Sequence, residues 1–146
     1  MRVLLVASVS VLSLLAPVPA SAAGCAWTST ALPLPEGTSF SQITGAAIDG
    51  SHVVGTGVAT PWRDVVLLWH NGSVESQPLA PGEFAADVNS SGTVLINSSQ
   101  GRARRAGVDL NPLPGAGYAF AVALNNSGTT VGNSGRTVAI WPGGLG

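Results

Sequence analysis

One short pattern recurs three times along this chain and limits what the chain can fold into. An apolar stretch runs into an aspartate or asparagine, a small polar turn with glycine, and then a valine-rich stretch. The aspartate or asparagine is Asp49, Asn89 or Asn125, and these positions are 40 and then 36 residues apart. A period of this length indicates supersecondary units that each pack on their neighbours.

Each copy has the composition of short β-strands. Valine, isoleucine and threonine cluster between turn residues, and no stretch after residue 22 keeps apolar residues at helical spacing for three turns. Asn71-Gly72 between apolar segments predicts a type I′ hairpin, because both central residues of that turn need positive φ. In the first copy we predict strands over 43–48, 52–58, 64–70 and 73–79.

A tryptophan recurs in phase with this pattern. Trp69 and Trp141 each follow a valine-rich run and precede a glycine turn, whereas the middle copy has only Arg104-Arg105-Ala106-Gly107. Because the two tryptophans recur in register, we expect them in the core. The middle unit is therefore predicted to be less regular.

Four strands per unit predict an all-β, propeller-like array of about three four-stranded units. The repeat domain covers 43–146, with units at about 43–82, 83–117 and 118–146. Closed propellers usually have four to eight blades, so three units fall short. The array is then open, or completed to a ring by self-association, or belongs to a shortened member of a longer family.

The N-terminus reads as a cleaved signal helix over 1–22. Arg2 supplies the positive start, 3–16 are almost uninterruptedly apolar, and Ala20-Ser21-Ala22 offers a small-residue cleavage site. The run is short for a membrane-spanning anchor, which is the alternative.

The only cysteine, Cys25, follows small residues that resemble a bacterial lipoprotein leader. We expect a secreted protein, with a lipoprotein anchored through Cys25 as the alternative to a free thiol.

The segment 23–42 contains a spare piece of the repeat. Trp27 to Gly37 resembles the last part of a unit, Trp69 to Gly82, while the third unit lacks its fourth strand. The segment is therefore predicted to hold a strand that completes the third blade and joins the two chain ends.

These landmarks together resemble the HAF-repeat family of probable extracellular bacterial repeat proteins. Its repeats carry an alanine-isoleucine-asparagine stretch, a valine-valine-glycine strand and a tryptophan-asparagine-glycine hairpin. The residues that match are Ala47, Ile48, Asp49, Val53, Val54, Gly55, Trp69, Asn71 and Gly72, and again Leu124, Asn125, Ser127, Gly128, Val131, Gly132 and Trp141. The resemblance implies a propeller-like β architecture and an exported location, and brings no catalytic residues.

Charge and residue types disfavour several functions. Without 1–22 the chain has five arginines against seven carboxylates and no lysine, which argues against a nucleic-acid partner. Only His52 and His70 are available to activate a nucleophile, and no serine lies in a G-x-S-x-G turn. We therefore expect no enzyme and no catalytic residue, cofactor or metal site. A secreted glycosidase-type hydrolase, using carboxylates that the sequence does not pair, is the competing class.

Three residues are the binding candidates, for polysaccharide or another surface protein. Trp62 lies in a loop after Pro61, where an aromatic ring could stack on a sugar. Arg102 and Arg104 would share one face of a strand and could suit an anionic ligand, although with Arg105 they also fit a solvated outer strand. Asp49, Asn89 and Asn125 are expected to form structural turns through their side chains.

The function predicted is a binding or structural module at or beyond the cell surface, or a truncated repeat protein with no independent function.

Overall fold

The computed structural model describes residues 28–144, and within them the protein is all-β. No helix occurs in this part of the chain, so none there is long and apolar enough to span a membrane. The chain divides into two units, residues 1–30 and residues 31–146, and every strand belongs to the second. The predicted signal segment 1–22 and Cys25 lie outside the described residues.

The first sheet is an antiparallel meander whose strands pair in chain order. Its strands are β1 (Thr38–Ala46), β2 (His52–Ala59), β3 (Arg63–His70) and β4 (Ser73–Pro78). The last three agree with the predicted strands to within one residue at each end, whereas β1 starts five residues before the predicted 43. Asn71 and Gly72 have φ of 50° and 76°, which confirms the positive values expected for the β3–β4 hairpin.

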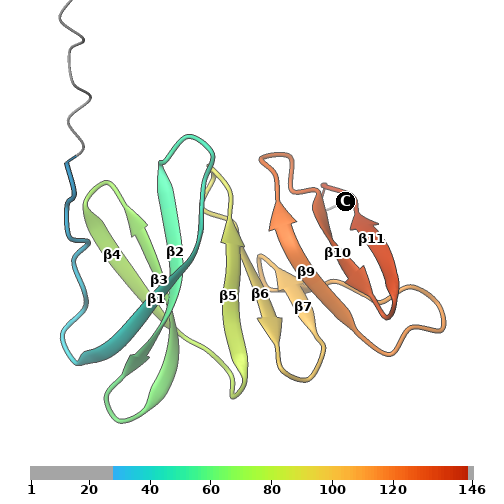
Figure 1. Cartoon of the computed structure of the whole chain (residues 1–146), viewed down its shortest axis with the longest axis horizontal. Helices are drawn as coiled ribbons and strands as arrows, with labels where there is room; N and C mark the ends of the chain where they lie inside the picture. The colour runs from blue at the N-terminus through green and yellow to red at the C-terminus, as the bar shows by residue number, and fades with distance from the viewer. Residues whose placement is uncertain (1–27, 145–146) are drawn as a thin grey trace, which may run out of the picture. The chain divides into compact units, whose positions relative to one another are not determined.

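Two further meanders follow along the chain (Figure 1). The second sheet consists of β5 (Glu83–Val88), β6 (Val94–Ser98), β7 (Ala103–Arg105) and β8 (Val108–Asp109). The third consists of β9 (Ala119–Leu124), β10 (Thr130–Ser134) and β11 (Thr137–Trp141). Each sheet lies within one predicted unit, apart from the first five residues of β1, and the third sheet has three strands among the described residues.

The first strand of every sheet carries a β-bulge at the same place. The register with the second strand skips Thr44 in β1, Ala86 in β5 and Val122 in β9. The first two bulged residues are 42 positions apart and the last two are 36 apart. Because a bulge bends its strand and increases the local twist, the three first strands share one shape.

The turns that follow these strands show that the predicted alignment of the first copy is wrong by two residues. The amides of Gly92 and Gly128 donate to the carbonyls of Asn89 and Asn125, at 3.0 Å in both cases. In the first sheet Gly50 makes this bond with Ala47, at 2.9 Å. Ala47 therefore occupies the position of the two asparagines, and Asp49 lies two residues further on.

The same shift decides which apolar residue enters the core. Ile48, aligned by the sequence with Val88 and Leu124, is 94% exposed, while Val88 and Leu124 are buried. Pairing places Ala46 opposite Val53, as Val88 lies opposite Val94. The three sheets are equivalent, but with Ala46 rather than Ile48 at this position.

The first and second sheets each pack an apolar face on the first strand of the sheet that follows. Val54 and Val66 of the first sheet form one cluster with Ala85, Val88 and Ile96 of the second. A second cluster joins the second and third sheets, and its buried members are Leu95, Ala103, Leu110, Ala119, Ala121 and Leu124. Burial of each larger side chain contributes about 1.5–3 kcal/mol, so these two clusters hold the sheets together.

Residues 33–37, which precede β1, contact the first sheet. Residues 28–35 form no strand, and the carbonyl of Pro33 accepts a 2.7 Å hydrogen bond from the indole Nε1 of Trp69. Trp141 donates in the same way to the carbonyl of Asn111, at 2.8 Å. The segment before the first sheet thus contacts Trp69 of that sheet. The linker before the third sheet contacts Trp141 in the same way.

Candidate binding groove

An open groove of about 640 Å³ runs along the first strands of the three sheets. Its walls are residues 42–44 of β1, 56–58 of β2, 84–86 of β5 and 120–122 of β9, with Asp64 and Asn97. The rings of Phe84 and Phe120 meet in it, with centroids 6.1 Å apart and planes at 47°. We call this feature the inner-strand groove.

The repeat itself places these side chains. Gln42 pairs with Thr56, Phe84 with Asn97 and Phe120 with Asn133, and each pair lies at the same distance from the bulge of its sheet. The three first-strand residues therefore occupy equivalent positions, one glutamine and two phenylalanines. Directly paired residues project to one face of an antiparallel sheet, so each ring lies beside a polar side chain.

Hydrogen bonds between sheets fix the walls of the groove. Asn97 donates from Nδ2 to the carbonyl of Ala121 at 2.7 Å, and its Oδ1 accepts from the amide of the same residue at 2.9 Å. At the equivalent position the Thr56 hydroxyl accepts from the amide of Ala85, at 2.9 Å. Asp87 accepts from the amide of Leu124, at 2.8 Å. The edges of β5 and β9 that have no neighbouring strand thus have hydrogen-bond partners in side chains of the preceding sheet.

The chemistry of the groove is apolar with few charges. Asp64 is the only titratable side chain among the lining residues, and the other polar groups are hydroxyls and amides. Hydrolysis of a glycosidic bond ordinarily uses two carboxyl groups about 5–10 Å apart. One carboxylate beside two aromatic rings instead suits the contacts that hold a sugar or an extended chain in place.

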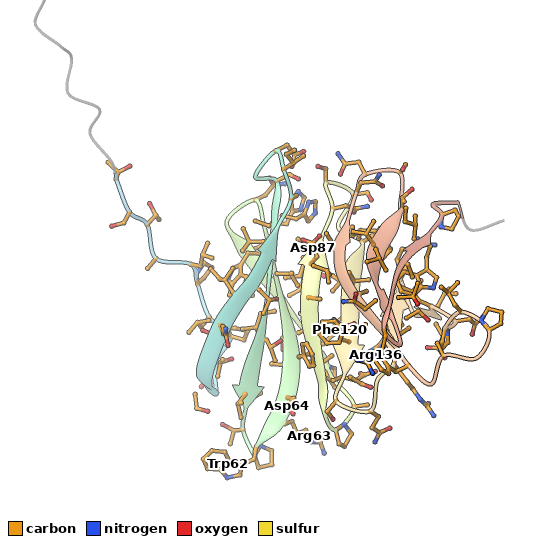
Figure 2. All side chains as sticks on the ribbon, turned by 45° about the vertical axis from the view of Figure 1, so that its right-hand side comes forward. Trp62, Arg63, Asp64, Asp87, Phe120 and Arg136 are labelled. Atoms are coloured by element: carbon orange, nitrogen blue, oxygen red, sulfur yellow. The ribbon has the colours of Figure 1, made fainter. Side chains whose placement is uncertain are left out.

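Trp62 lies outside the groove. Its side chain is 87% exposed, in the β2–β3 turn with φ of 70°, and Figure 2 shows it clear of the ribbon with Arg63 and Asp64 nearby. Phe120 lies further along the sheets in the same view. Of the residues in this turn region, only Asp64 is brought to the groove.

The three arginines of the cluster differ in their burial and in their hydrogen-bond partners. Arg104 forms a bidentate ion pair with Glu83, at 3.0 Å from Nε and 2.8 Å from Nη2, which lowers the pKa of Glu83 and raises that of Arg104. Arg102 directly precedes β7 and its side chain is exposed. With Arg104 and Glu83 it lines a separate hollow of about 140 Å³. Arg102 and Arg104 do not line the inner-strand groove.

Arg105 is buried, which the prediction of a solvated outer strand missed. Its Nη1 donates to the carbonyl of Gly128, to the Thr130 hydroxyl at 3.3 Å and to the carbonyl of Pro142 at 3.2 Å. The cation therefore ties the second sheet to the third, because it donates to carbonyls that flank β10 and follow β11.

Ser51, His52 and Asp49 lie close together but in an order unsuited to catalysis. The Ser51 hydroxyl is 3.0 Å from Nδ1 of His52 and donates to the Asp49 carboxylate at 2.7 Å. In a catalytic triad the carboxylate orients the histidine, whereas here it accepts from the serine. Hydrogen bonds from the side chain and the backbone of Ser51 lower the pKa of Asp49 to about 2. His52 stacks on His70, with centroids 4.1 Å apart.

The asparagine turns are confirmed as structural. Asn89 accepts at Oδ1 from Ser91 and Thr93, and Asn125 accepts from Ser127 and Thr129. Within residues 28–144 no three histidine, cysteine, aspartate or glutamate side chains group as metal ligands.

Comparisons with family models, with curated proteins and with solved structures find no match for this chain.

The groove was not predicted from the sequence, although the spacing of two aromatic residues is a signal for it. Phe84 and Phe120 are 36 residues apart, the same spacing as Asn89 and Asn125. Two aromatic residues in phase with a repeat indicate a shared position, and only the strand register shows that this position faces an open groove.

Proposed function

We propose that the protein is an exported, propeller-like β-repeat module that binds a largely uncharged polysaccharide in the inner-strand groove without converting it. The observation that carries this proposal is the contact between two tilted rings, Phe84 and Phe120, in an open groove with one carboxylate. Aromatic faces stack on sugar rings, and the amides and hydroxyls beside them offer hydrogen bonds to sugar hydroxyls.

A propeller-like arrangement is supported by the recurring geometry. Three meanders follow one another, and the first strand of each contacts the first strand or the second strand of its neighbour. The bulge and the glycine turn recur at equivalent positions in all three sheets. Neighbouring blades of a propeller pack in this way around their first strands. The HAF-repeat resemblance agrees with this proposal.

Location and partner class follow from sequence and charge. The leader-like segment 1–22 favours export, with Cys25 as the site of an alternative lipid anchor. No basic side chain lines the groove, which disfavours nucleic acid there. Another surface protein is the alternative occupant, since an exposed apolar groove can also take an extended peptide.

The test is binding and turnover of a panel of bacterial cell-wall and plant polysaccharides. The exported protein should be retained by at least one uncharged polysaccharide, and Phe84→Ala and Phe120→Ala should each weaken binding roughly tenfold, as expected for one lost stacking contact. Trp62→Ala is the matched control, because Trp62 is an exposed aromatic outside the groove. Release of reducing ends that is lost in Asp64→Asn would favour the glycosidase instead, and failure to bind any member of the panel would contradict the proposal.

A further inference from the structure

One face of the third sheet is apolar and exposed. Val131, Asn133, Val138 and Ile140 share it, because Val131 pairs with Ile140 and Asn133 pairs with Val138. Val138 is 77% exposed and Ile140 is 65% exposed. We call these four residues the open face.

The strand register identifies what the same face does in the other two sheets. In the second sheet the equivalent residues are Leu95, Asn97, Ala103 and Arg105, paired in the same pattern, and all four are buried. In the first sheet they are Val54, Thr56, Val66 and Leu68, of which the two valines are buried. In both sheets this face packs on the first strand of the sheet that follows.

The equivalent polar residue also makes a defined contact. Asn97 bonds the amide and the carbonyl of Ala121, and Thr56 bonds the amide of Ala85. Asn133 occupies this position in the third sheet and is exposed. The open face therefore carries both the apolar surface and the amide that join one sheet to the next.

We propose that the open face binds the first strand, β1, of a second copy of this chain, so that the third sheet of one copy packs on the first sheet of the next. The residue of β1 equivalent to Ala85 and Ala121 is Ile43, since it lies immediately before the bulge at Thr44 and pairs with Gly55. Ile43 is 56% exposed. Asn133 of one copy bonds the backbone of Ile43 of the next, continuing the interface already present between the sheets.

The segment before β1 leaves room for this contact. The carbonyl of Pro33 accepts a hydrogen bond from the indole of Trp69, and the carbonyl of Asn111 accepts the same bond from Trp141. Asn111 lies in the linker between the second and third sheets, so residues 33–37 occupy the equivalent position before the first sheet. In the second-to-third interface a sheet packs alongside such a linker. No charged side chain lies on the open face, and Ser41, Ile43 and Ala46 of β1 are uncharged. The two surfaces are therefore compatible without burying an unpaired charge.

The first test is the mass of the full chain in solution, without polysaccharide, by sedimentation. We expect two or more copies per particle, and Ile140→Glu and Val138→Glu should each weaken association at least tenfold, because a buried unpaired carboxylate is costly. Val108→Glu is the control, as Val108 is exposed and lies outside the open face. A wild-type protein that stays monomeric up to about 100 μM, or a Val108→Glu variant as weak as Ile140→Glu, would overturn the proposal.

The second test reports which faces meet. In a Cys25→Ser background, Asn133→Cys and Ile43→Cys variants are mixed and treated with a short thiol-reactive cross-linker. Cross-linked dimer should form in the mixture and in neither variant alone, because the proposed contact joins position 133 of one copy to position 43 of the next. Cross-linking of Asn133→Cys with itself would instead indicate two open faces packed together, and would refute the proposed partner. Neither test depends on polysaccharide binding, so its outcome is independent of that function.

Discussion

The side-chain amide of Asn97 makes both hydrogen bonds that the backbone of Ala121 offers on the free edge of β9, one as donor and one as acceptor. Both residues are buried. A side-chain amide has the donor and acceptor spacing of a peptide group, so Asn97 replaces the neighbouring strand that this edge lacks. The contact closes the edge of β9 and sets the width of the groove beside it.

Asn97→Ala is expected to lower the free energy of unfolding by about 2–4 kcal/mol, because it leaves a buried amide and a buried carbonyl without partners. Urea denaturation followed by tryptophan fluorescence measures the change. The matched control is Asn133→Ala, and both variants are compared in the Ile140→Glu background, where the proposed association is weakened. Since Asn133 is exposed, this control should change stability by less than about 0.5 kcal/mol. Equal effects at the two positions would contradict the role given to Asn97.

Arg105 gives a second test of the contacts between sheets. Its replacement by alanine removes three hydrogen bonds, to Gly128, Thr130 and Pro142, and leaves a cavity between the sheets, so we expect the free energy of unfolding to fall by about 2–4 kcal/mol. Arg105→Lys should recover only part of this, because an ammonium group lacks the planar set of donors. Thermal unfolding of each variant measures the change in stability. Arg102→Ala, which replaces an exposed neighbour, should change the stability little in the same measurement. A strong effect of Arg102→Ala would mean that charge, and not position, explains the loss.

Local signals in the sequence predicted the first sheet well. The Asn71-Gly72 turn and the strands around it depend on residues close together in the chain, and both were correct. The register of the first copy failed at Ile48, because the position equivalent to Asn89 holds Ala47 in the first sheet. An alignment on aspartate and asparagine therefore moves to Asp49, the nearest such residue, and shifts the preceding residues by two.

The groove and the buried arginine depend on contacts between sheets. A charged residue in a short strand normally predicts solvent exposure, and nothing local marks Arg105 as different from Arg104. Its burial follows from the carbonyls of the third sheet that surround it. Similarly, Phe84 reads as a core residue until the bulges at Ala86 and Val122 and the contact with Phe120 are known. Long-range packing therefore determines both the groove and the burial of Arg105.

Gly45 tests how closely the first two sheets approach. A Cβ at this position would lie 2.8 Å from Cα and Oδ1 of Asp87, so Gly45→Ala should force the sheets apart and cost about 1–3 kcal/mol. Gly117→Ala is the control, because nothing lies within 4 Å of the added Cβ. That control should be neutral or slightly stabilising, since alanine restricts the unfolded chain. Chemical denaturation of both variants measures the difference, and a tolerated Gly45→Ala would show that the interface yields easily.

The pH dependence of stability follows from two carboxyl groups. The pKa of Asp49 is lowered to about 2 by its bonds from Ser51, and the pKa of Glu83 is lowered by Arg104. A group with a lowered pKa stabilises the folded state fully above its unfolded pKa of about 4, and this contribution is lost as pH falls through the folded pKa. The wild-type protein should therefore lose stability progressively between about pH 5 and pH 2.

The Asp49→Asn and Glu83→Gln double variant should show a flatter profile over the same range, because it lacks both titrating groups. At pH 7 the ion pair of Glu83 with Arg104 contributes about 1 kcal/mol, since it is bidentate but only partly buried. Urea midpoints from pH 7 to pH 2 measure the profiles. Arg104→Met should remove the part due to Glu83 and leave the part due to Asp49, whose hydrogen-bond partner is Ser51. A profile as steep in the double variant as in the wild type would assign the acid sensitivity to other carboxylates.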